Sequence, residues 1–201
     1  MKYKKLLMKT FLIILGVLFL LFVGSQIYFY RSSRIIEGYQ YSVTKAYEGF
    51  EIRQYEASLF TSVKLDTDIY KQASSKGFSI LGGYIFGKNE KNEQISMTSP
   101  VALSLDEEMT IMFLVPKKFT KETLPKPENS DIQFIEVPEK IMAAITFGGW
   151  ASAIKIEKYK LQLTELLDKK AIKYSNKFSV LGYNSPFELL SRKNEIVVEL
   201  E

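Results

Sequence analysis

An uninterrupted run of uncharged residues near the N-terminus divides the chain into two parts suited to different surroundings. Residues 10–30 contain no charged side chain. As a helix, this 21-residue run would be about 31 Å long, close to the roughly 30 Å thickness of the hydrocarbon core of a bilayer. The run therefore predicts one transmembrane helix, and residues 1–31 are expected to form a cytoplasmic tail and a transmembrane anchor.

Basic residues flank this run unequally. Four lysines precede it, whereas Arg31 and Arg34 follow it. The excess of positive charge before the span favours a cytoplasmic N-terminus, so the remainder is predicted to be a periplasmic or extracytoplasmic domain on the cytoplasmic (inner) membrane of a bacterium. A cleaved signal peptide is the alternative, with Val23, Gly24 and Ser25 as a poor cleavage site. The length of the run favours an uncleaved anchor.

Charge is balanced over the rest of the chain. The sequence has 27 basic and 23 acidic residues, and the four N-terminal lysines account for the whole excess. A nucleic-acid-binding protein needs a basic face, so we expect no nucleic-acid partner. Residues 32–46 are predicted to be a linker, and residues 47–201 to form one domain long enough for a sizeable core.

The chain contains neither His nor Cys. Their absence excludes disulfides, thiol nucleophiles, Ser-His-Asp triads and the usual zinc sites. Ser152 and Lys155 match the S-x-x-K pattern of acylating enzymes, but the partner motifs of those enzymes are missing. Ser152 is better explained as a helix N-cap. We therefore predict a protein that is not an enzyme and has no metal site.

The expected elements occur in the same order twice. Apolar and polar residues alternate over residues 57–65, which indicates a half-buried strand, and apolar positions at helical spacing follow it. Each half is predicted to contain a strand, a helix and two further strands: residues 57–65, 68–84, 95–105 and 109–115 in the first half, and 141–147, 152–169, 178–182 and 195–200 in the second. This order predicts a β-α-β-β repeat.

Several stretches are too unusual to be explained by packing alone. Residues 77–89 read G-F-S-I-L-G-G-Y-I-F-G-K-N, residues 95–101 read I-S-M-T-S-P-V, residues 183–186 read Y-N-S-P and residues 192–196 read R-K-N-E-I. Together with Y-E-G-F-E-I-R-Q-Y at residues 47–55, they resemble the SOUL haem-binding protein family. The resemblance implies an α+β fold, in which a pseudo-twofold β-α-β-β repeat forms a distorted β-barrel with two main helices packed on it. It also implies haem or a related tetrapyrrole as the ligand.

The first of these stretches is predicted to provide the ligand surface. Phe78, Leu81, Gly82 and Ile85 share one helical face by their spacing, and the glycine leaves room for a flat ring. Lys76 beside this face could pair with an acidic substituent. The alternative is that this face only packs on the barrel. Because the commonest axial ligands of haem iron are missing, we expect weak, non-covalent binding through apolar packing, in a carrier or buffer.

Two other functions remain open from the sequence. SOUL domains are similar to the effector-binding domains of bacterial multidrug regulators, in which a buried acid between the two halves faces a cationic ligand. Glu51, Glu136 and Glu195 are the candidate acids for such an amphipathic or cationic ligand. The other alternative is a scaffold for protein partners in the cell envelope. Residues 192–195 are expected to orient the last strand rather than to bind a ligand.

Overall fold

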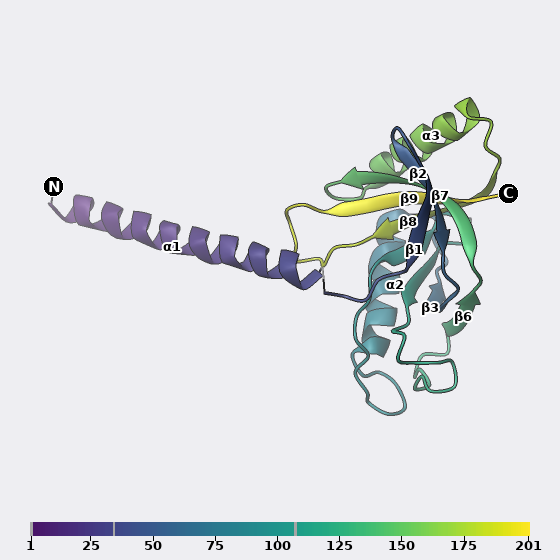
Figure 1. Ribbon diagram of the computed structural model, residues 1–201. Helices are drawn as coiled ribbons and strands as arrows, with labels where there is room; N and C mark the ends of the chain where they lie inside the picture. Colours follow the sequence, from purple (N-terminus) through teal and green to yellow (C-terminus); the bar gives the residue numbers. More distant parts are fainter. Residues whose placement is uncertain (1, 34, 107) are drawn as a thin grey trace.

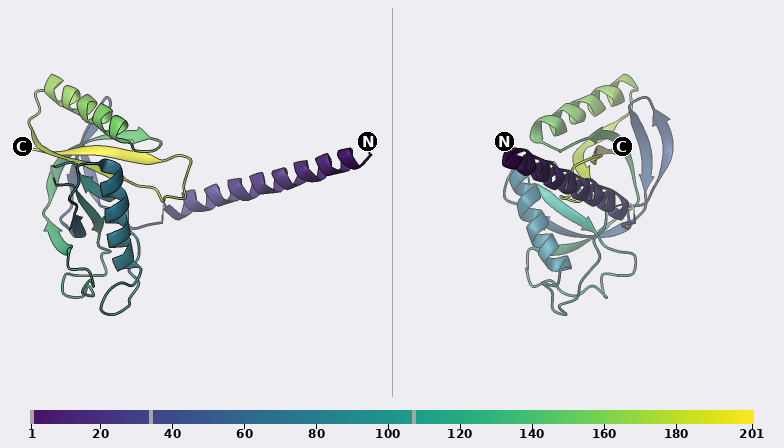
Figure 2. Two further views of the ribbon diagram at one scale, coloured as in Figure 1. Left: turned by 180° about the vertical axis from the view of Figure 1, so that it is seen from behind. Right: turned by 90° about the vertical axis from the view of Figure 1, so that its left-hand side faces the viewer.

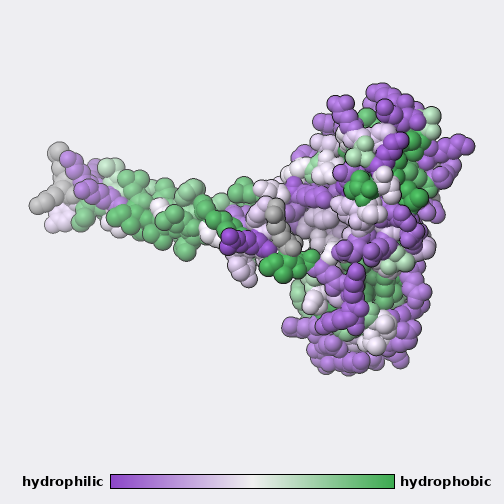
Figure 3. All heavy atoms as spheres, in the orientation of Figure 1, coloured by the Kyte–Doolittle hydropathy of each residue, from purple (hydrophilic) through white to green (hydrophobic). Residues whose placement is uncertain are grey.

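The computed structural model describes residues 2–33, 35–106 and 108–201. The helix α1 (Lys2–Ser33) extends away from the rest of the molecule (Figure 1). Among the described residues, Tyr3–Ser32 form the one helix that is long and apolar enough to cross a membrane. Hydrophobic side chains cover this helix almost to its junction with the domain (Figure 3).

One antiparallel sheet of nine strands forms the body of the domain. Its strands are β1 (Tyr41–Tyr47), β2 (Phe50–Tyr55), β3 (Ser58–Lys64), β4 (Val101–Ser104), β5 (Thr110–Leu114), β6 (Ile132–Val137), β7 (Lys140–Gly148), β8 (Tyr174–Gly182) and β9 (Lys193–Leu200). Their order across the sheet is β1-β2-β7-β9-β8-β4-β5-β3-β6. The sheet curls into a distorted half-barrel (Figure 2), which confirms the predicted α+β architecture.

Two β-α-β-β units meet at the centre of this sheet. The first unit is β3, α2 (Tyr70–Ile85), β4 and β5, and the second is β7, α3 (Ala153–Lys169), β8 and β9. Read outward from the β4–β8 junction, both units place their strands in the same order. The junction itself pairs Val101 with Gly182 and Ser104 with Ser179. The predicted pseudo-twofold repeat is therefore present.

Both helices lie against the outer face of the curled sheet, where they cover two hydrophobic cores. α2 packs with Ile111, Phe113 and other apolar residues of its own unit, and α3 packs with Phe178 and Ile196 of the second unit. Successive strand residues point to opposite faces. The residues between these core positions consequently point into the curl of the sheet.

Two segments differ from the sequence-based expectation. Residues 41–46, predicted as linker, belong to β1, which pairs with β2 from Tyr41 opposite Tyr55 to Tyr47 opposite Phe50. Nearly every residue of β1 is exposed, so this edge strand lacks the alternating pattern that would have revealed it. Residues 95–100 precede β4 rather than forming part of it, and Pro100 cannot donate to a strand ladder.

α2 approaches the sheet very closely at Gly77. A Cβ atom at this position would lie 2.2 Å from Cγ2 of Ile111, so only glycine fits. Gly82 is also buried, but a Cβ atom added there would lie 3.7 Å from the Phe78 ring and 3.9 Å from the Phe86 ring, which are ordinary contact distances. Gly77 thus allows the close packing of the helix on the sheet, whereas Gly82 lies beside two aromatic rings with room for a methyl group.

Candidate functional site

Residues from the first and last motifs meet inside the curled sheet. Arg53 of β2 and Glu195 of β9 point into the curl, and the guanidinium donates to both carboxylate oxygens, with Nη1 to Oε2 at 2.9 Å and Nη2 to Oε1 at 3.1 Å. Arg53 is only 3% exposed and Glu195 is fully buried. A bidentate pair of this kind is among the strongest charge-assisted interactions in proteins. It joins the motif at residues 47–55, on β2, to the motif at residues 192–196, on β9.

Two hydroxyl groups and the ammonium of Lys193, whose Nζ lies 3.0 Å from Oε1, complete the coordination of the Glu195 carboxylate. Tyr183 donates to Oε2 at 2.5 Å, and Thr146 donates to Oε1 at 3.0 Å. Burial acts to raise the pKa of Glu195, but the hydrogen bonds from Arg53 and Tyr183 outweigh it and hold the pKa of this carboxyl below its usual range. Glu195 is therefore ionised at neutral pH.

Aromatic rings enclose the Arg53 side chain. The guanidinium lies over the Tyr41 ring, 4.3 Å from its centroid, a cation–π contact. The Tyr39 and Tyr41 rings both pack on Tyr55, whose hydroxyl accepts a hydrogen bond from Arg53. Burial raises the pKa of Tyr39 to about 12, so its phenol is neutral under physiological conditions. Side chains of the protein itself therefore surround the Arg53 guanidinium.

Of the three candidate acids, Glu195 lies inside the curl of the sheet. Its negative charge is compensated by Arg53. Glu51 is partly exposed and also pairs with Arg53, at 2.7 Å. Glu136 lies on the exposed side of β6. The site expected to face a cationic ligand thus already contains a cation of the same chain.

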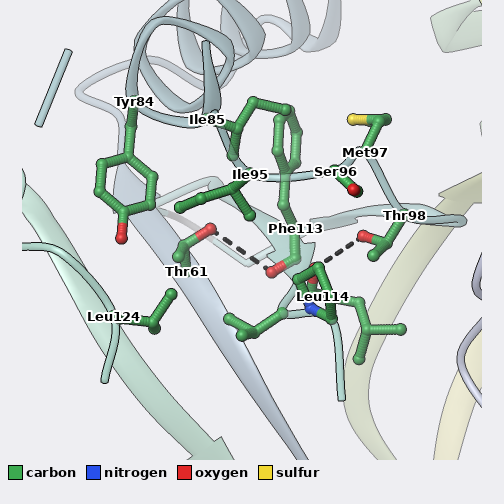
Figure 4. A pocket seen from close by; sticks show the side chains of 12 residues that line it. Thr61, Tyr84, Ile85, Ile95, Ser96, Met97, Thr98, Phe113, Leu114 and Leu124 are labelled. Atoms are coloured by element: carbon green, nitrogen blue, oxygen red, sulfur yellow. Dashed lines mark hydrogen bonds between the residues drawn. The ribbon is translucent and has the colours of Figure 1, made fainter. Parts of the chain in front are cut away.

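A small cavity lies between the end of α2, residues 95–98 and β5 (Figure 4). Its volume is about 10 Å³, room for roughly one water molecule. The hydroxyls of Thr61 and Thr98 at this cavity donate to the carbonyls of Phe113 and Leu114. Small-molecule sites commonly reach several hundred Å³, so this cavity is far too small for a tetrapyrrole.

The residues predicted to bind a ligand divide between two sides of α2. Leu81 and Ile85 are buried in the core beneath the helix, so the structure assigns their side chains to packing. Phe78 is half-buried and packs edge-on against Phe113, with 5.3 Å between centroids. Lys76 is exposed and lines a shallow depression together with Lys71. The predicted face therefore reaches the surface only at its margin, at the half-buried Phe78, whereas Gly82 is buried.

Two surface features flank that margin. On one side, the Phe78 and Phe86 rings border Gly82, and Phe86 is 65% exposed. On the other side is a shallow, open depression with two cationic and no acidic residues in its lining: Lys71, Gln72, Ser75, Lys76, Ser79 and Ile80. Both views of Figure 2 place α2 on the side of the domain from which α1 departs.

Arg53 and Tyr183 are site residues that sequence reasoning did not single out. Both lie within the motif stretches at residues 47–55 and 183–186, and that was the available signal. The C-terminal motif has the expected structural role as well, because Asn194 donates to the Gly149 carbonyl at 2.7 Å. Ser152 caps α3, accepting from the Lys155 amide, as predicted.

Comparison with known proteins agrees with these observations. Residues 36–199 match the SOUL heme-binding protein family. The chain is 31% identical to Heme-binding protein 2 of Mus musculus, over 73% of this chain and 76% of that protein. It is 25% identical to Heme-binding protein 1 of Xenopus laevis, over 73% of this chain and 81% of that protein.

A solved structure supports the fold alone. The C-terminal domain of EcmrR has a TM-score of 0.59 and 12% identity, covering 81% of this chain and 98% of that domain. At this identity the similarity concerns architecture and not ligand. The motifs, the pseudo-twofold sheet and the match over residues 36–199 lead to one conclusion: the chain belongs to the SOUL heme-binding protein family.

Proposed function

We propose that this protein is a membrane-anchored, non-enzymatic carrier or buffer of haem or a related tetrapyrrole. Membership of a heme-binding family supports the ligand class. The length and apolar character of α1 support an uncleaved, single-pass anchor, and the lysines before it favour an extracytoplasmic domain. The compensated charge of Glu195 argues against the alternative of a cationic ligand in the cleft.

The outer surface of α2 is the proposed binding surface. Lys71, Ser75, Phe78, Gly82 and Phe86 follow one another at intervals of four, three, four and four residues, which aligns them along one side of the helix. The small residue at position 75 allows a flat ring to approach, and the Phe78 and Phe86 rings, which lie beside the buried Gly82, supply apolar contact. This alignment is the observation on which the proposal chiefly depends.

Charge on the same surface suits the carboxylates of a porphyrin. Lys71 begins the aligned row, and Lys76 lies at the adjacent depression, whose lining contains no acid. Long lysine side chains can reach ligand carboxylates while their stems cover apolar surface. Lys76 and Phe78 of the predicted set therefore keep a proposed contact role, whereas the buried Leu81, Gly82 and Ile85 support the surface from beneath.

Apolar contact would supply most of the binding free energy. The chain has no His or Cys to ligate the iron. Covering roughly 300 Å² of apolar surface contributes about 7 kcal/mol, from which the loss of translational and rotational freedom subtracts several kcal/mol. We therefore expect a dissociation constant in the micromolar range, which suits reversible loading.

Titration of the full chain in detergent micelles with haemin tests this proposal. We expect a shifted Soret band that saturates at one haemin per chain, together with quenching of Trp150, the single tryptophan. Micelles without protein control for haemin that partitions into detergent. An unchanged Soret band and unquenched Trp150 at tens of micromolar haemin, about ten times the expected dissociation constant, would overturn the proposal.

A further inference from the structure

The loop between β8 and β9 contacts α1 inside its apolar run. The side chain of Gln26 accepts a hydrogen bond from the Leu189 amide at 2.9 Å and donates one to the Phe187 carbonyl at 3.3 Å. Gln26 is buried by this contact. A side-chain amide without partners is costly in an apolar environment, and here the loop backbone satisfies both of its polar ends.

An aromatic pair reinforces the same contact. The rings of Phe29 and Phe187 stack with 5.6 Å between centroids and an interplanar angle of 24°. Phe29 is one turn further along α1 than Gln26, so the loop follows the helix rather than touching it at one point. Both orientations in Figures 1 and 2 show the β8–β9 connection beside the end of α1.

The loop has an unusual distribution of side chains. Phe187, Leu189 and Leu190 are 67%, 46% and 59% exposed, whereas Glu188 between them is buried. Arg192 holds the loop from within, because Nη1 donates to the carbonyls of Ser185 and Glu188 at 2.9 and 2.7 Å. Contiguous exposed apolar residues on an ordered segment mark an interaction surface.

A tryptophan lies beside this loop. The guanidinium of Arg192 stacks on the Trp150 ring at 3.9 Å from its centroid, and the ring is half exposed. The Gly149 amide also donates to the Arg192 carbonyl, which joins the β7–α3 turn to the β8–β9 loop. Tryptophan is enriched where a protein meets the boundary between lipid and water.

From these contacts we propose that residues 186–190 enter the outer interface of the bilayer that α1 spans. Gln26 lies four residues before the end of the uncharged run, about 6 Å along the helix axis. A segment fixed at that level reaches the boundary between headgroups and acyl chains, where apolar side chains of interfacial segments lie about 5–10 Å deep. This inference rests on the proposed membrane anchor.

Lipid therefore covers the exposed apolar side chains of residues 186–190. The apolar side chains of the loop continue the apolar surface of α1, and no separate partner is needed to cover them. Two attachments, the helix and the loop, fix the orientation of the domain on the membrane. They also hold the side of the domain formed by α2 toward the bilayer (Figure 2).

Site-directed spin labelling of the full chain tests the inference, because the sequence contains no cysteine to remove. Leu190→Cys, Leu15→Cys and Lys169→Cys are each labelled with a nitroxide in nanodiscs of phosphatidylcholine and phosphatidylglycerol. Leu15 lies in the middle of the apolar run, and Lys169 lies at the end of α3 remote from α1 (Figure 1). The readout is the ratio of collision rates with oxygen and with a water-soluble nickel chelate.

We expect the ratio at position 190 to exceed that at position 169 several-fold and to lie below that at position 15, because an interfacial segment is shallower than the middle of the apolar run. A water-like ratio at position 190 together with a lipid-like ratio at position 15 would overturn the loop inference and leave the anchor intact. A water-like ratio at position 15 would overturn the anchor and the loop inference together.

Discussion

The guanidinium of Arg53 and the carboxylate of Glu195 form a fully buried, two-point ion pair across 142 residues of sequence. β2 and β9 lie on the same side of the β4–β8 junction, and the pair lies within the curl of the sheet. Side chains of the protein therefore occupy this part of its interior. The outer surface of α2 is the site that we propose for ligand binding.

Removing one member of the buried pair should destabilise the domain. Arg53→Met leaves the buried Glu195 with only the partly exposed Lys193, 3.0 Å from Oε1, as a cationic partner, and breaking a buried pair costs about 3–5 kcal/mol. Urea unfolding of the full chain in micelles measures this loss. Lys64→Met is the matched control, because its pair with Glu108 is exposed and should contribute less than about 1 kcal/mol. Equal free energies of unfolding for Arg53→Met and Lys64→Met would contradict a stabilising role for the buried pair.

The buried carboxylate should also make stability depend on pH. The folded-state pKa of Glu195 lies below its ordinary value of 4.5. Its contribution is then complete above that value and is lost as the pH falls through the folded-state pKa. We expect the difference in unfolding free energy between the parent protein and Glu195→Gln to be largest near about pH 7 and to shrink below about pH 4.5. If the difference in unfolding free energy stayed constant below about pH 4.5, the ionised Glu195 carboxylate would not be its source.

Gly77 and Gly82, two of the three glycines of α2, should respond oppositely to a methyl group. Gly77→Ala places Cβ 2.2 Å from Ile111, and such overpacking costs about 1–3 kcal/mol. Gly82→Ala has room beside the Phe78 ring and should raise helix stability by up to about 1 kcal/mol. Thermal unfolding measures both.

Gln26 should restrain the β8–β9 loop. Gln26→Leu removes two hydrogen bonds to this loop, and a single hydrogen bond contributes about 1 kcal/mol. Hydrogen exchange of the Leu189 amide should therefore accelerate roughly fivefold or more. Ser25→Ala is the control, because its hydroxyl bonds only to the Phe22 carbonyl within α1. Unchanged exchange in Gln26→Leu would show that the loop is held without the helix.

The element order and the family could be predicted because they depend on local patterns. Alternation marked β3, helical spacing marked α3, and Ser152 marked the start of α3. β1 could not be predicted in this way, because its residues are almost all exposed. An edge strand of that kind is fixed by pairing with β2, which is tertiary information.

Only part of the candidate site could be predicted from the sequence, because the rest also depends on tertiary structure. Spacing places Phe78, Leu81 and Ile85 on one side of a helix, but it cannot say whether that side meets solvent or the sheet. The structure resolves this, because Leu81 and Ile85 lie in the core. Likewise, the partnership of Arg53 with Glu195 requires the sheet order that brings β2, β7 and β9 together.

Comparison of two exposed apolar positions tests the α2 surface most directly. Phe86 of the proposed surface and Leu161 on α3 are 65% and 53% exposed, so glutamate at either position should leave the fold intact, as circular dichroism can verify. We predict that Phe86→Glu weakens haemin binding at least about tenfold, equivalent to about 1.4 kcal/mol, whereas Leu161→Glu binds like the parent protein. Equal haemin affinity in Phe86→Glu and Leu161→Glu would contradict the account.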